Sequence, residues 1–267
     1  MGNKKDFLGD RIKENYENRS QTYLLRRTPV IIRLDGCRFH SYTKGFAKPF
    51  DERFIEAMQR TTQALCQSIY GCVFGYTQSD EISLVLVDYQ HIGCEAWFDY
   101  SVQKLCSVSA AMCTLFFNKV IEALFTQYCE ANEDSDDEQV QKFINTYETA
   151  LKKRVACFDA KAFNVPETEV VNAILWRQND AIRNSVASLA QAHFSRKELH
   201  GKNTNQMRDM LMEKYGINWN ELDICKKWGS AVIWDDEGKW VIDKEMPILR
   251  GDSESYLENL IHFGEDD

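Results

Sequence analysis

The feature of this 267-residue chain that most restricts its fold is the order of the elements expected between residues 30 and 164. Runs of β-branched residues favour strands, whereas apolar residues recurring every three or four positions favour amphipathic helices. The expected elements are a strand at 30–34, a helix at 51–70, hairpin strands at 72–76 and 81–87, a helix at 97–128 and a strand at 155–164. This order is the β-α-β-β-α-β unit, so the sequence predicts an α+β protein with a ferredoxin-like sheet.

The segments on either side of this unit are expected to be mainly helical. Helices are predicted at 10–27, 167–192 and 205–215, and a small β-hairpin at 232–242. No flexible linker separates the parts. We therefore expect a domain of residues 1–165 packed tightly against a C-terminal helical region of residues 166–267, with Trp176 in the core.

The composition restricts the cellular setting. No stretch approaches the roughly 20 apolar residues that cross a bilayer, and the first residues lack the apolar core of a secretory signal. The nine cysteines contain no CxxC pair and no zinc-like spacing. These features predict a protein of the reducing cytoplasm that does not bind a membrane.

The net charge of −9 does not decide whether the partner is a nucleic acid. Six of the acids lie in the run Glu130–Glu138, which is expected to be a solvated turn, so the rest of the chain carries −3. Basic residues cluster elsewhere, at 152–154, 177–183, 196–202 and 226–227. Binding to a phosphate backbone depends on such local potential more than on total charge.

Two carboxylates stand where expected strands meet turns. Asp35 ends the first strand, and Asp80 lies in the hairpin turn. In a ferredoxin-like sheet these positions can be neighbours, and Mg²⁺ prefers oxygen ligands such as one or two carboxylates with phosphate oxygens. Taken alone, Asp-Gly after a strand is an ordinary turn signal. The pair in this topology favours a magnesium site, and the same unit forms the palm of many nucleotide polymerases and cyclases.

A candidate phosphate-binding loop follows the first strand. It comprises Gly36, Cys37, Arg38, Phe39 and His40. Backbone N–H groups in such a loop can face a triphosphate. A solvated basic loop, with Phe39 in the core, remains the alternative at this point.

Motifs spread over most of the chain resemble those of the tRNA-His guanylyltransferase-like family of 3′–5′ RNA polymerases. They are Arg33-Leu34-Asp35-Gly36, Phe39-His40, Phe46-Ala47-Lys48-Pro49, Gln78-Ser79-Asp80-Glu81, Lys104-Leu105-Cys106-Ser107, Phe158-Asp159, Trp176-Arg177-Gln178-Asn179-Asp180, Asn184-Ser185, Gly201-Lys202-Asn203 and Ile217-Asn218-Trp219. Each motif is weak alone, but their number and common order make the resemblance specific.

The resemblance implies a set of functional residues. Asp35, Asp80 and the Gly36 carbonyl would ligate two Mg²⁺ ions, and residues 36–40 would hold ATP, GTP or another nucleoside triphosphate. Supporting roles fall to Lys48, Ser79 and Glu81 at the active site, to Lys104 at phosphate, and to Arg183, Lys202 and Asn218 at RNA. The resemblance also implies tRNA as the partner and a homotetramer built as a dimer of dimers.

One departure from the family pattern concerns the substrate. Enzymes that mark tRNA-His carry a histidine where this chain has Ile182, within Ile182-Arg183-Asn184-Ser185. This resembles the guanylyltransferase-like branch that repairs 5′-truncated tRNA by templated addition. Addition of a single G to tRNA-His stays an alternative, and a nucleotide cyclase or a non-catalytic RNA-binding protein are more distant ones.

Overall fold

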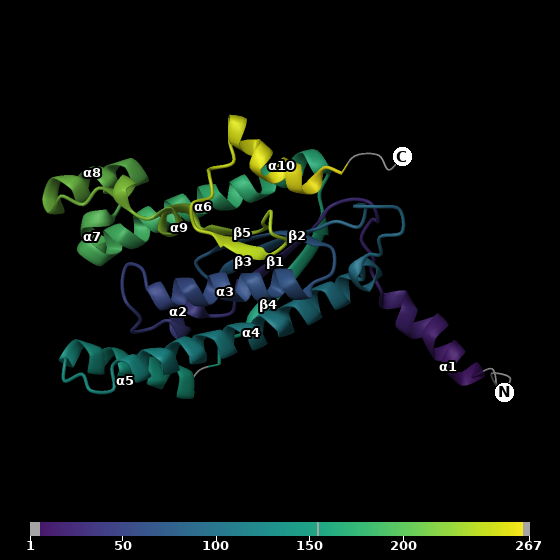
Figure 1. Ribbon diagram of the computed structural model, residues 1–267, viewed down its shortest axis with the longest axis horizontal. Coiled ribbons are helices and arrows are strands. Elements are labelled where there is room, and N and C mark those ends of the chain that lie inside the picture. Colours follow the sequence, from purple (N-terminus) through teal and green to yellow (C-terminus); the bar gives the residue numbers. More distant parts are fainter. Residues whose placement is uncertain (1–5, 154, 264–267) are drawn as a thin grey trace.

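The computed structural model describes residues 6–153 and 155–263, with a six-stranded sheet at its centre (Figure 1). The strands are β1 (Val30–Gly36), β2 (Cys72–Gln78), β3 (Glu81–Leu86), β4 (Phe158–Asn164), β5 (Ser230–Trp234) and β6 (Trp240–Asp243). They lie in the order β4-β1-β3-β2-β5-β6, and each neighbouring pair is antiparallel. The first four have the ferredoxin-like arrangement, which confirms the predicted α+β fold.

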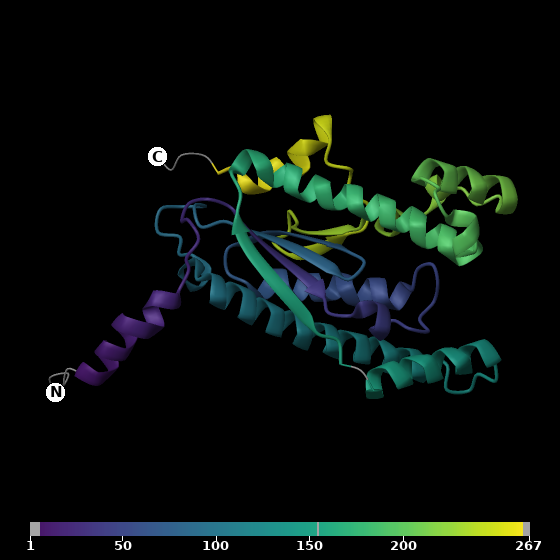
Figure 2. The same ribbon diagram turned by 180° about the vertical axis from the view of Figure 1, so that it is seen from behind.

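Helices cover both faces of the sheet and make three layers (Figures 1 and 2). One face carries α3 (Glu52–Ser68) and α4 (Val102–Ala131), and the other carries α6 (Glu167–His193) and α10 (Ser255–Ile261). Side chains alternate between the faces of a strand. Ile32 and Leu34 of β1 therefore enter the α3–α4 core, whereas Val85 of β3 and Tyr76 of β2 enter the core beneath α6 and α10.

The predicted C-terminal hairpin is present, and it extends the central sheet. Strand β5 pairs with β2, and β6 pairs with β5 on its outer side. Val232 of β5 is fully buried in the same core as β1. The C-terminal region therefore shares the sheet with the rest of the chain.

A helical lobe forms at one end of α6, away from both termini (Figure 1). We use this name for the C-terminal half of α6 together with α7 (Arg196–Leu199) and α8 (Thr204–Tyr215). Capping boxes at Ser195 and Asn203 fix the starts of α7 and α8, because side chain and backbone satisfy each other there. Leu189, Leu211 and Trp219 belong to its separate apolar core.

The predicted helix at 10–27 is present, but it begins at Phe7 and ends at Ser20, seven residues earlier than predicted. Helix α1 covers Phe7–Ile12, a π-helical turn follows at Lys13–Glu17, and a 3₁₀ turn ends it at Asn18–Ser20. Figure 1 shows α1 projecting from the body of the protein, and it contains no buried residue. Isolated short helices are marginal in water, so without tertiary packing the helix ends early.

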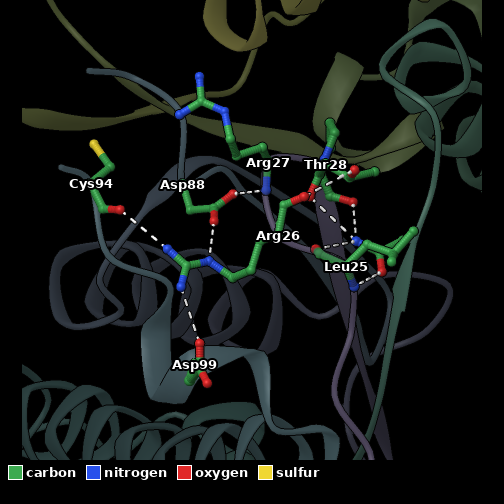
Figure 3. Close-up of polar contacts among 9 residues, drawn as sticks. Leu25, Arg26, Arg27, Thr28, Asp88, Cys94 and Asp99 are labelled. Atoms are coloured by element: carbon green, nitrogen blue, oxygen red, sulfur yellow. Dashed lines mark hydrogen bonds and ion pairs between the residues drawn. The ribbon is translucent and has the colours of Figure 1, made fainter. Parts of the chain in front are cut away.

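Arg26 fastens the extended segment after α1 to the sheet (Figure 3). Its guanidinium donates to Asp88 at 2.5 Å, to Asp99 at 3.1 Å and to the Cys94 carbonyl at 3.3 Å. The Asp88 side chain is fully buried and also accepts from the Arg27 amide at 2.8 Å. These contacts mark the sheet edge at which β1 begins and β3 ends.

Helix α4 differs from the expectation in two respects. It begins at Val102, five residues later than predicted, and α5 (Glu138–Lys153), which the sequence analysis did not foresee, follows it. By length and composition α4 could also span a membrane, contrary to the expectation that no segment does. One of its faces, which includes Leu105, Cys113 and Phe117, packs in the core against the sheet.

Candidate active site

Five strands bring polar residues to one edge of the sheet. Strands β1 and β2 end there, and β3, β4 and β5 begin there. Asp35 lies opposite Glu81 on one side and opposite Asp159 on the other. The Gly36 amide donates to the Asp80 carbonyl at 3.0 Å, which joins the end of β1 to the β2–β3 turn. The structure thus gathers Asp35, Gly36 and Asp80 at this edge, which we call the acidic edge.

The electrostatics of the acidic edge favour a bound cation. Burial raises the pKa of Asp35, and the negative charges of Asp80 and Asp159 raise it further, while Arg33 and Arg177 act in the opposite direction. A cation held between the carboxylates would relieve this repulsion.

The donor set at this edge suits a hard cation, which prefers oxygen ligands. The described residues contain no group of three or more His, Cys, Asp or Glu side chains arranged to hold a metal. Two carboxylates and a backbone oxygen fit Mg²⁺, which completes its shell with water and substrate phosphates.

The loop after β1 is tighter than its sequence suggested. The Phe39 ring packs against Gly36, where an added Cβ would lie 2.3 Å from Phe39 Cδ2. Phe39 is 4% exposed and contacts the rings of Phe54 and Phe158. Its side chain is therefore a core residue and no platform for a nucleobase.

The backbone of the same loop is partly occupied. The Gly36 amide donates to Asp80, and the Cys37 amide donates to the Cys157 carbonyl at 2.8 Å, so neither N–H faces a ligand. Phe39 and His40 open the short helix α2 (Phe39–Tyr42), and the first amides of a helix have no acceptor within it. Arg38 precedes them in the left-handed conformation with φ of 58°, and its side chain and that of His40 are exposed.

Cys37 and Asp159 also touch across the edge. The Cys37 thiol donates to Asp159 Oδ2 at 3.5 Å. Burial raises the pKa of this thiol, and so do the hydrogen bond to Asp159 and the neighbouring Cys157.

Glu81 serves a structural role that the sequence analysis did not assign to it. Both of its carboxylate oxygens accept from Arg177, at 2.6 and 2.7 Å, and the two side chains are only 9% and 11% exposed. Burial raises the pKa of Glu81 and the hydrogen bonds from Arg177 oppose that rise. Arg177 also donates to Asp180, which accepts from Arg183 at 2.7 Å. Glu81 therefore anchors α6 to the sheet, and its carboxylate is not free for an ion.

A cavity of about 190 Å³ opens beside the acidic edge, between the loop that precedes α3 and helices α6 and α9 (Ile224–Trp228). Its polar lining includes Lys48, Ser79, Asn184, Ser185 and Ser188. Ser79 Oγ also donates to Asp80 at 3.0 Å, so one turn faces both the cavity and the acidic edge.

Other predicted residues lie elsewhere. Lys104 is in the first turn of α4, beside Ser101, which bridges to Tyr23 near the start of β1. That edge is one strand length, roughly 20 Å, from the acidic edge, so within this chain Lys104 does not reach the predicted site.

The predicted RNA contacts lie on or near the helical lobe, and some are engaged in the fold. Arg183 and Lys202 are exposed, although Arg183 is paired with Asp180. The Asn218 side chain caps the turn Trp219–Glu221, accepting from the Asn220 amide and donating to Glu221.

The basic pair that follows the lobe is also engaged within the fold. Lys226 pairs with Asp223 at 2.8 Å and with Glu52, and buried Lys227 donates to the Asn220 carbonyl. These two lysines therefore cannot be counted as a free basic surface.

Asp159 and Arg177 were present in the motifs but received no role. The ferredoxin-like order places β4 beside β1, so an acid at the second position of β4 must lie near Asp35. The strand order identifies β4 as the neighbour, and the register that sets Asp159 opposite Asp35 comes from the structure. No sequence signal identified the partner of Arg177, because its contact with Glu81 spans 96 residues.

Comparisons with known proteins identify the family of this chain. The family described as tRNAHis guanylyltransferase matches residues 9–166. A bacterial tRNA(His) guanylyltransferase (Thg1)-like protein in complex with ATP is 38% identical, with a TM-score of 0.81, covering 96% of this chain and 100% of that chain. The structure of such a bacterial protein in complex with GTP is 35% identical, with a TM-score of 0.75, covering 97% and 100%.

A viral protein is also similar to this chain. Protein R259 of Acanthamoeba polyphaga mimivirus is 28% identical over 84% of this chain and 76% of its own length. The family match covers more than half of this chain, and the bacterial structures cover nearly all of it. The chain therefore belongs to the tRNA(His) guanylyltransferase family of nucleotidyltransferases.

Proposed function

We propose that this protein is a template-dependent 3′–5′ nucleotidyltransferase that repairs the 5′ end of tRNA. The observation that carries this proposal is the meeting of Asp35 and Asp80 beside the loop of residues 36–40. ATP and GTP occupy the similar bacterial proteins, which supports nucleoside triphosphates as substrates here. Residues 1–165 would supply the catalytic palm, and residues 166–267 would support RNA binding.

Asp35, Asp80 and the Gly36 carbonyl would hold two Mg²⁺ ions. When bound, Mg²⁺ neutralises the triphosphate and stabilises the attacking and leaving oxygens. The protein supplies position and charge, as in other phosphoryl transfers. The Phe39 and His40 amides would orient the triphosphate, and Lys48 would place a positive charge at the cavity mouth.

The reaction has two steps. An oxygen of the RNA 5′-monophosphate attacks the α-phosphorus of ATP, which releases pyrophosphate and leaves a 5′-adenylylated end. The 3′-OH of an incoming nucleoside triphosphate then attacks the RNA 5′-phosphorus and AMP leaves. A 5′-triphosphorylated end needs no activation.

Ile182 supports templated repair over dedicated marking of tRNA-His. Its side chain packs against the apolar core of the helical lobe, where a histidine would be a polar substitution. Addition of one G to tRNA-His is the second candidate, because the matching family is described by that activity. By resemblance, we infer a cytoplasmic homotetramer.

The experiment that tests the proposal varies the template. A tRNA lacking its first 5′ nucleotide is incubated with ATP, Mg²⁺ and all four nucleoside triphosphates, with each base in turn opposite the gap. Addition that follows Watson–Crick pairing supports repair, whereas G added regardless of the template supports the second candidate. Cyclic nucleotide formed without RNA, or RNA binding without any addition, contradicts both.

A further inference from the structure

Two exposed cysteines face each other across the sheet at the acidic edge. Cys37 follows β1 and Cys157 precedes β4, directly beyond the last paired residues, Gly36 and Phe158. The Cys37 amide donates to the Cys157 carbonyl at 2.8 Å, so the ladder continues for one more residue pair. Both cysteines are free and exposed, and their side chains are near enough to interact.

The backbone spacing at this pair suits a disulfide. Cα atoms of a hydrogen-bonded antiparallel pair are about 5.5 Å apart. Disulfides join cysteines whose Cα atoms are about 4.4–6.8 Å apart. The backbone spacing therefore allows the two sulfur atoms to meet by rotation of the side chains.

We propose that Cys37 and Cys157 form a reversible covalent modification site, at which a hydroperoxide converts the two thiols into a cross-strand disulfide that stops nucleotide addition. Formation of the disulfide does not depend on the proposed function. The expected loss of nucleotide addition does rest on that function.

The chemistry balances with one hydroperoxide. The Cys157 thiol loses its proton, and its sulfur attacks the peroxide; the O–O bond breaks, an S–OH group forms on Cys157, and the alcohol, or water from H₂O₂, leaves with that proton. The second sulfur then attacks the S–OH sulfur, the S–S bond forms, the S–O bond breaks, and water leaves with the second thiol proton. The two cysteines lose two electrons, and the peroxide gains them.

The position of Cys37 explains why such a bond would stop addition. Cys37 lies between Gly36 and Arg38, in the loop proposed to hold the triphosphate. A disulfide removes the thiol that donates to Asp159 and ties the loop to β4. Displacements of about 1 Å in a positioning loop can cost about 100-fold in rate. We therefore expect addition to fall about 10- to 100-fold.

A second close pair provides a matched comparison. Cys66 and Cys72 also interact, but Cys66 is buried with 2% exposure beneath α3, where a peroxide in solution does not reach it. The described cysteines thus include one accessible pair and one shielded pair. Oxidation should select the accessible pair.

The test uses the full chain, reduced and then treated with H₂O₂, in wild-type, Cys157→Ser and Cys72→Ser forms. Peptides are mapped without reduction, and nucleotide addition is measured before treatment, after it, and after dithiothreitol. We expect a Cys37–Cys157 linked peptide, a 10- to 100-fold loss of addition and recovery by dithiothreitol in the wild-type and Cys72→Ser proteins. The Cys157→Ser protein should keep its activity and form no such link.

Each contrary outcome overturns a stated part. Absence of the linked peptide removes the modification site, and a linked protein with full activity removes its effect. Equal inactivation of Cys157→Ser would show that inactivation does not require the Cys37–Cys157 pair. If the link forms but the reduced protein adds no nucleotide, the proposed function fails and the modification site stands.

Discussion

Asp35 and Glu81 lie directly opposite each other on β1 and β3, yet only Glu81 is paired with an arginine. Among residues 6–153 and 155–263, Asp35 forms no ion pair. Burial is the main cause of its raised pKa, and the negative charges of Asp80 and Asp159 raise that pKa further. One acid of the pair therefore holds α6 in place, and the other remains available to a cation. Two acids that look alike in the sequence therefore differ in the fold, because Glu81 has a structural partner and Asp35 is the one proposed to bind metal.

Replacing Asp80 by Asn should abolish nucleotide addition without unfolding the protein. The side chain lies in a two-residue turn, so its loss removes a proposed metal ligand and no core packing. Mutation of residues that only hydrogen-bond to metal ligands lowers metal affinity or activity about 10- to 100-fold. Loss of a direct ligand should therefore lower the rate of addition by at least about 100-fold. The measurement is the rate of addition to 5′-truncated tRNA, with circular dichroism to check the fold.

The control for Asp80 is Asp236→Asn, in the turn between β5 and β6. Asp236 is an exposed aspartate in a hairpin turn, but this turn follows the end of β5, whereas the acidic edge lies where β5 begins. Its activity should equal that of the wild type. Full activity in Asp80→Asn would remove Asp80 from the site.

Replacing Arg177 by Met should destabilise the protein by about 3–5 kcal/mol, because it leaves the buried Glu81 carboxylate without its partner. The free energy of unfolding is measured by urea titration. In the double variant Glu81→Gln with Arg177→Met, the cost should be smaller than the sum of the single costs by about 1–3 kcal/mol. Additive costs would show that the bidentate pair contributes nothing of its own.

Asp180 should make stability depend on pH in the acid range. Burial raises the pKa of its carboxyl, but hydrogen bonds and charges of Arg183 and Arg177 outweigh burial and lower it below 3.8. The pKa of this carboxyl is therefore lower in the folded than in the unfolded protein. Its contribution to the free energy of unfolding is present above the unfolded-state pKa and is lost as the pH falls through the folded-state pKa. For this partly exposed carboxylate we expect about 1 kcal/mol at neutral pH.

The free energy of unfolding is measured for the wild-type and Asp180→Asn proteins at a series of pH values from neutral downward. The difference should narrow below pH 3.8 as the wild-type carboxylate becomes protonated. Asp209→Asn serves as the control, because Asp209 is exposed and has no ion-pair partner in the described parts of the chain. A difference that widens on acidification would contradict this assignment.

The sheet and its acidic edge were predictable from the sequence because local patterns and topology agree there. The β-branched run of β1 and the hairpin β2–β3 are local signals, and the ferredoxin-like order then fixes their neighbours. Trp176 shows the limit: it was expected in the core but is 53% exposed. Arg33 and Arg177 lie near its ring instead, at 5.5 and 4.5 Å, and no periodicity encodes such contacts.

The errors at the ends of elements have a related cause. The segment 10–27 has helical composition, but it projects from the body and buries nothing in α1 or in the turns that follow. In contrast, α5 forms directly after the acidic run, in residues to which the sequence analysis assigned no element, because Tyr147 buries its ring there and donates to Asp51. Tertiary contacts decided both cases, and a single sequence does not reveal them.

Gly229 should be intolerant of any side chain. Its φ of 94° and ψ of −169° lie in a region that is essentially restricted to glycine. An added Cβ would also lie 2.4 Å from the Thr77 carbonyl oxygen, on the strand that β5 pairs with. The Thr77 carbonyl belongs to a paired strand and cannot move aside as a flexible side chain can. Gly229→Ala should therefore lower the free energy of unfolding by at least about 3 kcal/mol.

Gly93→Ala separates strain from collision. Gly93 has a φ of 96°, close to that of Gly229, but a Cβ there meets nothing within 4 Å. It should cost only about 1–2 kcal/mol, the price of the backbone conformation alone. Urea titration of both variants gives the difference in cost, to which the collision with Thr77 contributes. Equal costs would mean that β5 shifts away from β2 to admit the methyl group, and that the start of β5 at the acidic edge is less rigid than its pairing implies.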